Sequence, residues 1–273
     1  MAERVFTTMH EGWLRLLFTS FAVRDREWGE RLYDYSEILY RHMRFVEELF
    51  VKRGIEYSYE RPALTLEFEN EGEAARFSLV GVERILDQLN ESKDPLASRI
   101  IHDLRYIASQ LSRNLGKEEP ITAFDKSLKL DGVDLDKESL DALVLFLFEE
   151  SYKEYELIII YSYAQRVVDS KRVFEIFQIL IDESKFHLKS FAHLMARLGI
   201  LAVPRMVTQE IYRFDSLKRF LEDGIEEEKG AKEQCRALAE AVKNDELRDF
   251  FNFINFQEDY HITLMKEALE IIE

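Results

Sequence analysis

The sequence predicts an all-α protein made of two helical bundles in succession. Apolar residues recur at three- and four-residue spacing through most of the 273 residues, which is the pattern of amphipathic helices. The chain has only 10 glycines and 4 prolines, whereas 47% of its residues are hydrophobic. Such a composition favours long uninterrupted helices around a substantial core over a turn-rich sheet protein.

Four helices are expected in each half of the chain. In chain order they cover about residues 4–23, 26–53, 72–91, 95–115, 138–168, 170–198, 216–243 and 245–271. Residues 54–72 break the helical pattern, and the alternation of polar and apolar residues at 57–59 and 64–68 is typical of short strands. Residues 199–215 form a second long connection, and four-helix bundles are often wired through one.

The boundary between the halves is predicted in a polar segment that contains Pro120, Gly132 and many acidic residues. We therefore expect an N-terminal helical bundle over residues 1–116, a linker over 117–137 and a C-terminal four-helix bundle over 138–273.

Composition argues against several classes of protein. The formal net charge of −16 argues against nucleic acid as a partner, because phosphate binding needs a cationic surface. Cys235 is the only cysteine, which excludes an intrachain disulfide and a cysteine-based metal site and fits a reducing compartment. Residues 13–23 are apolar but indicate a core helix, and no apolar stretch is long enough to span a bilayer. We expect a cytoplasmic protein without membrane contact.

The two helical hairpins of the second half resemble each other after a shift of 74 residues. Glu154 then falls on Glu228, and His187 falls on His261. Apolar helical patterns match one another easily, so the coincidence of glutamate and histidine carries more weight than that of the hydrophobic residues.

Helix geometry gives an independent indication of where these side chains lie. In an antiparallel hairpin, residues equally far from the turn lie at the same height, since each residue rises ~1.5 Å. Glu154 then faces Glu183 across the first hairpin, and Glu228 faces Glu258 across the second. Each pair lies roughly 22 Å from its turn, which is close to the middle of the bundle.

A local motif points to metal binding at this level. Residues 258–261 read Glu-x-x-His, so Glu258 and His261 share one helix face and can bind one metal ion. Ile254 and Leu264 bracket the motif on the apolar stripe, which directs it inward. Buried carboxylates repel one another and are costly to desolvate, and divalent cations would remove that penalty.

The combination of Glu228 with Glu258-x-x-His261 resembles half of a ferritin-like di-iron carboxylate bundle, the superfamily of rubrerythrins and bacterioferritins, over about residues 139–273. Such proteins place one glutamate on each of two helices and Glu-x-x-His on each of the other two. The resemblance implies a ferritin-like fold and a centre of two Fe ions, or Mn/Fe. The ligands that it implies are Glu154, His187, Glu228, Glu258 and His261.

The second helix of this half departs from the pattern. Glu183 stands four residues before His187 instead of three, and a strict alignment places Ser184 at the ligand position. Glu183 can still coordinate, because i and i+4 share a helix face and a one-residue π-bulge would restore the geometry. Alternatively, the site lacks this carboxylate and binds its second metal poorly. We favour Glu183 as the sixth ligand.

The first half of the chain does not repeat the motif. His42, Glu83 and His102 form only a loose cluster when helix heights are compared. We therefore expect a degenerate bundle without metal there.

The resemblance implies a non-haem di-iron or iron–manganese oxidoreductase that reacts with dioxygen or peroxide. No catalytic acid, base or nucleophile can be named. A rubredoxin-like cysteine pair is absent, so an external electron donor would be needed. The alternatives are a non-enzymatic metal-binding protein and a metal-free helical scaffold for another protein. The oligomeric state is left open, with a homodimer among the options.

Aromatic residues near the predicted centre have two explanations. A cavity lined by Phe177, Phe191 and Phe256 could accept an apolar substrate, although the same rings would also serve as core. Three tyrosines could approach the metals or simply pack: Tyr152, Tyr155 and Tyr161.

Overall fold

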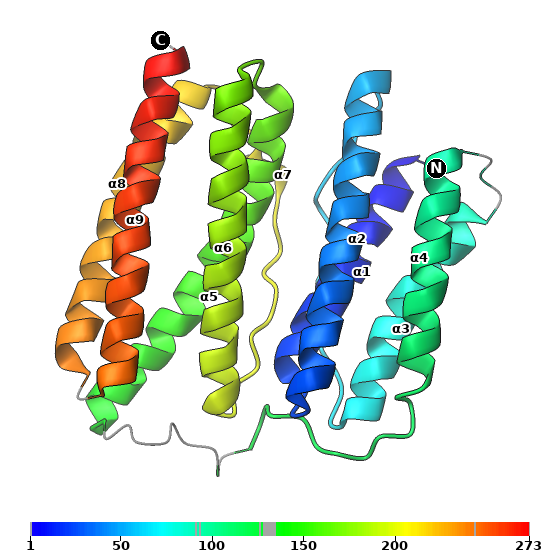
Figure 1. Cartoon of the computed structure of the whole chain (residues 1–273), viewed down its shortest axis with the longest axis horizontal. Coiled ribbons are helices and arrows are strands. Elements are labelled where there is room, and N and C mark those ends of the chain that lie inside the picture. The colour runs from blue at the N-terminus through cyan, green and yellow to red at the C-terminus, as the bar shows by residue number, and fades with distance from the viewer. Residues whose placement is uncertain are drawn as a thin grey trace. The chain divides into compact units, whose positions relative to one another are not determined.

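The computed structural model describes residues 2–90, 92, 94–125, 127, 135–242 and 244–272, without the side chains of Ala2 and Glu3. Within this part of the chain the protein is all-helical and contains no strand (Figure 1). The helices are α1 (Ala2–Ala22), α2 (Arg26–Arg53), α3 (Glu71–Leu89), α4 (Pro95–Ser112), α5 (Lys137–Val167), α6 (Lys171–Arg197), α7 (Gln209–Tyr212), α8 (Leu217–Ala241) and α9 (Asp245–Ile272). None of them has a stretch apolar enough to cross a bilayer.

The chain divides into two compact units. Unit 1 comprises residues 1–128 and 196–209, and unit 2 comprises residues 129–195 and 210–273. The expected linker at 117–137 falls across this division, and its residues 126 and 128–134 lie outside the described residues.

Short polar side chains and glycine set the helix ends. Asp25 begins α2 by accepting a hydrogen bond from the backbone N–H of Trp28, and Asp136 begins α5 by accepting one from Ser139. Gly54 ends α2 in the left-handed conformation, with φ of 64°, which only glycine adopts without strain. The predicted long helices are all present, and the four-residue α7 is an addition that the periodicity did not indicate.

The connection between α2 and α3 in unit 1 corrects one prediction. No strand forms at 57–59 or 64–68. The rings of Tyr57 and Tyr59 instead pack edge-on against Phe6 of α1, with centroids 5.0 and 5.1 Å away. Their alternation therefore reflects packing on a helix rather than pairing with a neighbouring strand.

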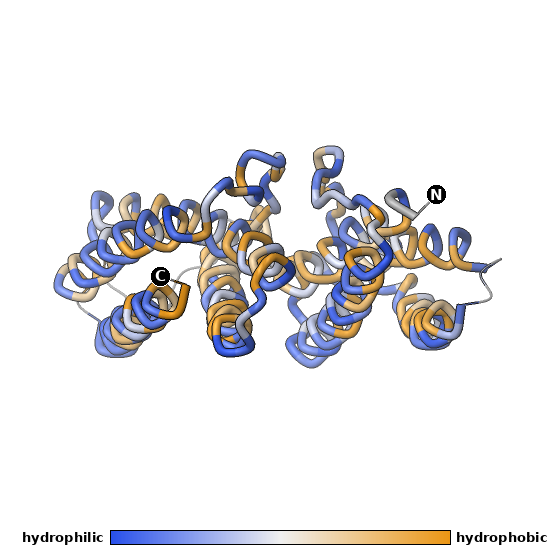
Figure 2. The backbone as a smooth tube through the Cα atoms, turned by 90° about the horizontal axis from the view of Figure 1, so that it is seen from above, coloured by the Kyte–Doolittle hydropathy of each residue, from blue (hydrophilic) through white to orange (hydrophobic). Residues whose placement is uncertain are grey.

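Unit 2 contains four long helices around one interior. In Figure 1, α5 and α9 run upward while α6 and α8 run downward. Hydrophobic and hydrophilic residues alternate along the helical tube in Figure 2, as amphipathic packing requires. Large apolar side chains that fill the interior include Leu147, Ile158, Phe177, Leu180, Leu221, Phe251 and Ile254. Several charged side chains enter this interior near the middle of their helices, and they form the candidate site.

Candidate metal centre

Five buried ionisable side chains from all four long helices meet inside unit 2. α9 supplies two of them, one turn apart, and each of the other three helices supplies one. They are Glu154 of α5, His187 of α6, Glu228 of α8, and Glu258 and His261 of α9. All five are less than a tenth exposed, so their charges must be balanced inside the protein.

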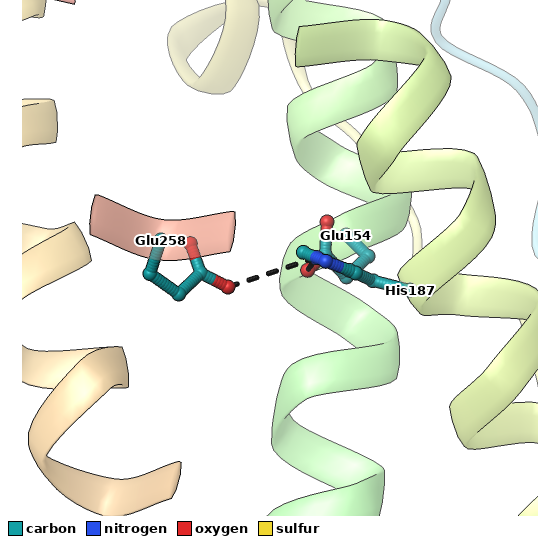
Figure 3. Close-up of side chains that lie close together, drawn as sticks. All are labelled: Glu154, His187 and Glu258. Carbon is teal, nitrogen blue, oxygen red and sulfur yellow. Dashed lines mark hydrogen bonds and ion pairs between the residues drawn. The ribbon is translucent and has the colours of Figure 1, made fainter. Parts of the chain in front are cut away.

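The first group of possible metal donors joins three helices (Figure 3). His187 Nδ1 lies 2.8 Å from Glu154 Oε1 and 3.6 Å from Glu258 Oε1. The donor atoms of these three residues all lie within 4.8 Å of one another. The second carboxylate oxygen of Glu154 is buried and has no hydrogen-bond partner. An unpaired buried carboxylate oxygen is costly, which makes this a favourable place for a cation.

The second group shares one residue with the first. His261 Nδ1 lies 3.1 Å from Glu258 Oε2 and 3.4 Å from Glu228 Oε1. The donor atoms of these three residues also lie within 4.8 Å of one another. Glu258 thus offers one carboxylate oxygen to each group, as a carboxylate bridging two metal ions does. The imidazole rings of His187 and His261 stand 5.7 Å apart.

The outer nitrogen of each imidazole, Nε2, forms a hydrogen bond with a side chain of another helix. His187 Nε2 of α6 donates to Gln257 Oε1 of α9 at 3.1 Å, and His261 Nε2 of α9 donates to Glu183 Oε2 of α6 at 2.6 Å. A hydrogen bond at Nε2 fixes the ring so that Nδ1 faces the interior, where it can bind a metal.

The pKa shifts of these side chains favour forms in which protons offset their charges. Burial lowers the pKa of His187, but the neighbouring Glu154 carboxylate outweighs it and raises that pKa to about 9. Burial also lowers the pKa of His261. Its hydrogen bonds to Glu183 and Glu228 outweigh this effect and raise the pKa well above its usual value. Burial and the adjacent Glu228 carboxylate raise the pKa of Glu258 well above its usual value, which favours its protonated form. Metal ions binding here would displace these protons.

Glu183 lies outside both donor groups. Its side chain is 23% exposed, and its carboxylate bonds to the outer nitrogen of His261 rather than facing the carboxylates of the centre. Ser184 occupies the buried position three residues before His187, and its hydroxyl has no hydrogen-bond partner. The helix therefore presents Ser184 where a Glu-x-x-His motif would present its glutamate.

The sequence did not indicate Gln257, and the cavity that it predicted near the centre had a different lining. A cavity of about 620 Å³ lies along α5 and α8 and is lined by Glu154, Glu228 and Glu258 among others. The lining of this cavity includes none of the three phenylalanines predicted to line one. Phe177 and Phe191 are core residues, and Phe256 is 74% exposed.

Unit 1 has no comparable group of donors among its described residues. His42 Nε2 bonds to Asp103 Oδ2 at 2.9 Å, a pairing that the sequence did not suggest. Burial is the larger influence on His42 and lowers its pKa, although Asp103 acts in the opposite direction.

The donor set in unit 2 consists of carboxylate oxygens and imidazole nitrogens without a thiolate. Carboxylate oxygens are hard donors that suit manganese and iron, and imidazole nitrogens also bind iron, so the donor set fits these metals. No protein-family model, curated protein or solved structure matches the chain.

Proposed function

We propose that unit 2 is a ferritin-like bundle that holds two Fe ions, or Mn/Fe, and acts as an oxidoreductase on dioxygen or peroxide. One observation carries the proposal. Two groups of three buried donors from four helices share Glu258, so the protein has the donors for two adjacent metal ions. Helices are rigid supports, and they hold such donors without a large change in backbone on binding.

In this proposal Glu154 and His187 hold one ion, Glu228 and His261 hold the other, and Glu258 bridges them. Glu183 orients the His261 ring through a hydrogen bond to its Nε2 instead of binding metal, and Gln257 orients the His187 ring in the same way. The centre then carries three carboxylates, which leave positive charge uncompensated when two divalent ions bind.

The residues present fit such a pair of ions. A bound cation would give the buried, unpartnered oxygen of Glu154 a partner and would reverse the upward shift in the pKa of Glu258. When bound, iron or manganese would supply open coordination positions and redox chemistry for a small oxidant. The protein's own residues orient the ligands and exclude bulk water from the interior.

An enzyme is favoured over a metal carrier because the cavity along α5 and α8 reaches three of the carboxylates. A metal store needs a path for ions, whereas a cavity of about 620 Å³ has the volume of a pocket for an organic molecule. Cys235 is the only cysteine, so electrons must come from an external donor or from the substrate itself.

Elemental analysis of purified protein tests the proposal. Protein from cells supplied with iron and manganese should contain about two ions per chain, as a dinuclear carboxylate bundle requires. The double variant Glu228→Gln/His261→Ala should lose most of this metal. Glu240→Gln, an exposed position on the same helix, should keep it and serves as the matched control. Wild-type protein that is folded but free of metal would contradict the proposal.

Oxygen or peroxide consumption separates the enzyme from a carrier. Iron-loaded wild-type protein should consume dioxygen or hydrogen peroxide repeatedly when a chemical reductant is supplied, and the double variant should not. Metal binding followed by a single turnover only would favour the non-enzymatic metal-binding alternative. Absence of metal would leave a helical scaffold as the better explanation.

A further inference from the structure

The cavity along α5 and α8 is larger than the proposed reaction with a small oxidant requires. Its volume of about 620 Å³ falls among those of pockets for small organic molecules, ~300–1,000 Å³. Glu154, Glu228 and Glu258 line it, so a molecule bound there would lie beside the metal centre.

One part of the cavity has apolar and aromatic walls. Leu157 and Tyr161 of α5 line it, as do Phe214 and Phe220 on the other side. The rings of Phe214 and Phe220 are stacked, with centroids 4.9 Å apart and planes within 10°. Tyr161 meets Phe220 nearly edge-on at 6.2 Å. Walls of this kind favour a flat aromatic ring, which can stack or make edge contacts against them.

The charges around the cavity favour an uncharged molecule. Among the described residues that line it, nine are acidic and three are basic. Two of the basic residues already have acidic partners: Lys153 lies 2.8 Å from Glu150, and Arg219 lies 3.5 Å from Asp223. The six acidic residues other than the proposed ligands would repel an organic anion, and the positive charge left on two ions with three carboxylates would repel an organic cation.

Tyr161 provides a hydrogen-bond donor without an acceptor. Its side chain is buried, and its hydroxyl has no partner in the protein. A tyrosine on a helix leans toward the helix N-terminus, and Glu154 lies about two turns before Tyr161 on the same helix. Buried donors are rarely left unpaired, so an acceptor atom of a ligand is expected at this position.

We propose that the cavity binds an uncharged aromatic compound carrying a hydroxyl group, with its ring between Leu157 and Phe220 and its oxygen at Tyr161. This inference rests on the proposed function and deepens it by naming the class of organic substrate. The hydroxyl oxygen accepts the hydrogen bond of Tyr161, which lines the same cavity as the three proposed ligand carboxylates.

Two probes of nearly equal shape test the hydrogen bond. 2-Naphthol and 2-methylnaphthalene differ by a hydroxyl in place of a methyl group, and their own fluorescence reports binding. Binding is measured with full-length protein loaded with zinc, which carries no redox chemistry. 2-Naphthol should bind about fivefold more tightly than 2-methylnaphthalene, the amount that one hydrogen bond contributes.

The substitution Tyr161→Phe should remove this preference and leave the affinity for 2-methylnaphthalene unchanged. Tyr152→Phe is the matched control, because Tyr152 lies on the same helix, packs against Phe148 and does not line the cavity. A preference that persists in Tyr161→Phe would overturn the assignment of the oxygen to Tyr161.

A second substitution tests the place of binding. Leu157→Trp should fill part of the cavity and weaken both probes at least tenfold. Leu145→Trp, at an exposed position on the same helix outside the cavity, should not. If Leu157→Trp fails to fold, nuclear Overhauser effects from 2-naphthol to the methyl groups of Leu157 and Ile160 in wild-type protein give the same information.

Charge is tested with 2-naphthoate, which should bind more weakly than 2-naphthol. Absence of binding by both neutral probes, equal binding in Leu157→Trp, or tighter binding of the carboxylate would each overturn the inference. Failure to bind zinc would count against the proposed metal centre instead. The same probes added to metal-free protein would then still decide whether the cavity is a binding site.

Discussion

Glu183 and Gln257 perform the same task for the two imidazoles, but they differ in charge. The carboxylate of Glu183 makes His261 a more basic ligand than a neutral amide can, and Gln257 provides only an amide oxygen to His187. If the proposed centre binds two ions, its two positions should therefore differ in affinity, with the position of His261 filled first.

The substitution Glu183→Gln tests this asymmetry. The amide can still accept from His261, so the ring keeps its orientation but loses basicity, and the tighter of two binding steps should weaken about 10–100-fold. Calorimetric titration of metal-free protein with Mn²⁺ measures both steps. The converse substitution Gln257→Glu should strengthen the weaker step. Loss of a whole equivalent of metal in Glu183→Gln would instead support the sequence-based prediction that Glu183 is a ligand.

His10 links the stability of unit 1 to pH. It is fully buried, and its Nδ1 donates to the carbonyl oxygen of Tyr59 at 2.9 Å. Burial and then the charge of Arg61 lower its pKa from 6.5 to about 3, against the opposing effect of the carbonyl. In the unfolded chain the imidazole takes up a proton below its ordinary pKa, so the unfolded state binds more protons between these two values.

The contribution of neutral His10 to the stability of unit 1 is therefore complete above the ordinary histidine pKa. It is lost as the pH falls toward the pKa of His10 in the folded state. Urea unfolding at pH 7 and at pH 4.5 should show a larger loss of stability for wild type than for His10→Asn. Asparagine can still donate to the carbonyl but does not titrate, and the difference approaches ~1.4 kcal/mol per pH unit. His102→Asn, at an exposed position, should retain the wild-type dependence.

At the scale of elements, a buried charge network attaches the connection after α2 to that helix. The Tyr59 hydroxyl donates to Glu47 Oε1 at 2.6 Å, and Arg44 donates to both Glu47 and the Tyr59 oxygen. All three side chains are buried. The connection from Ile55 to Glu69 has no helix of its own, so these contacts and the tyrosine rings hold it in place.

The substitution Glu47→Gln should destabilise unit 1 by about 3–5 kcal/mol, because it leaves the Arg44 cation buried without its counter-charge. Urea unfolding followed by tryptophan fluorescence measures the change, since Trp13 and Trp28 both lie in unit 1. Glu48→Gln removes an exposed carboxylate one residue along the helix and should change stability by less than about 0.5 kcal/mol. Equal stability of the two variants would show that Arg44 is satisfied without Glu47.

The sequence predicted the long helices because their apolar spacing is regular over many turns. The error lay at 57–59 and 64–68, where alternation was interpreted as strands. Short alternation does not distinguish a strand from an extended segment that packs tyrosines onto a helix, since only the neighbouring element decides between them. The four-residue α7 is too short to show any period.

For the candidate site, the repeat and the Glu-x-x-His motif predicted the residues, and helix geometry predicted their level along the bundle. Glu154, Glu228 and His261 meet in the interior as the repeat indicated. The place of Glu183 could not be predicted in the same way. A residue four positions before His187 can face its own histidine or the neighbouring helix, and the packing of α6 against α9 decides which. Residues from four separate segments line the cavity, so no local sequence pattern could predict its lining.

At the scale of the whole molecule, the two units divide the chemistry between them. Within the part of the chain that the structure describes, all candidate metal donors lie in unit 2, and both tryptophans of the chain lie in unit 1. Each unit has its own buried core, so a ligand of one need not stabilise the other. Tryptophan fluorescence therefore reports the unit that we expect to be free of metal, whereas circular dichroism reports helices of both.

Removal of metal should consequently shift only one of two unfolding transitions. A site with free metal at 100 times its dissociation constant gains about 2.7 kcal/mol, and this gain belongs to unit 2 alone. Circular dichroism should show a transition of unit 2 that tryptophan fluorescence does not report. Addition of a chelator should lower the melting temperature of this transition. Glu228→Gln/His261→Ala should melt as chelated wild type does, with or without metal. Metal could instead raise the melting temperature measured by tryptophan fluorescence as much as the one measured by circular dichroism. The two units would then unfold as one, and the metal centre would stabilise the entire chain.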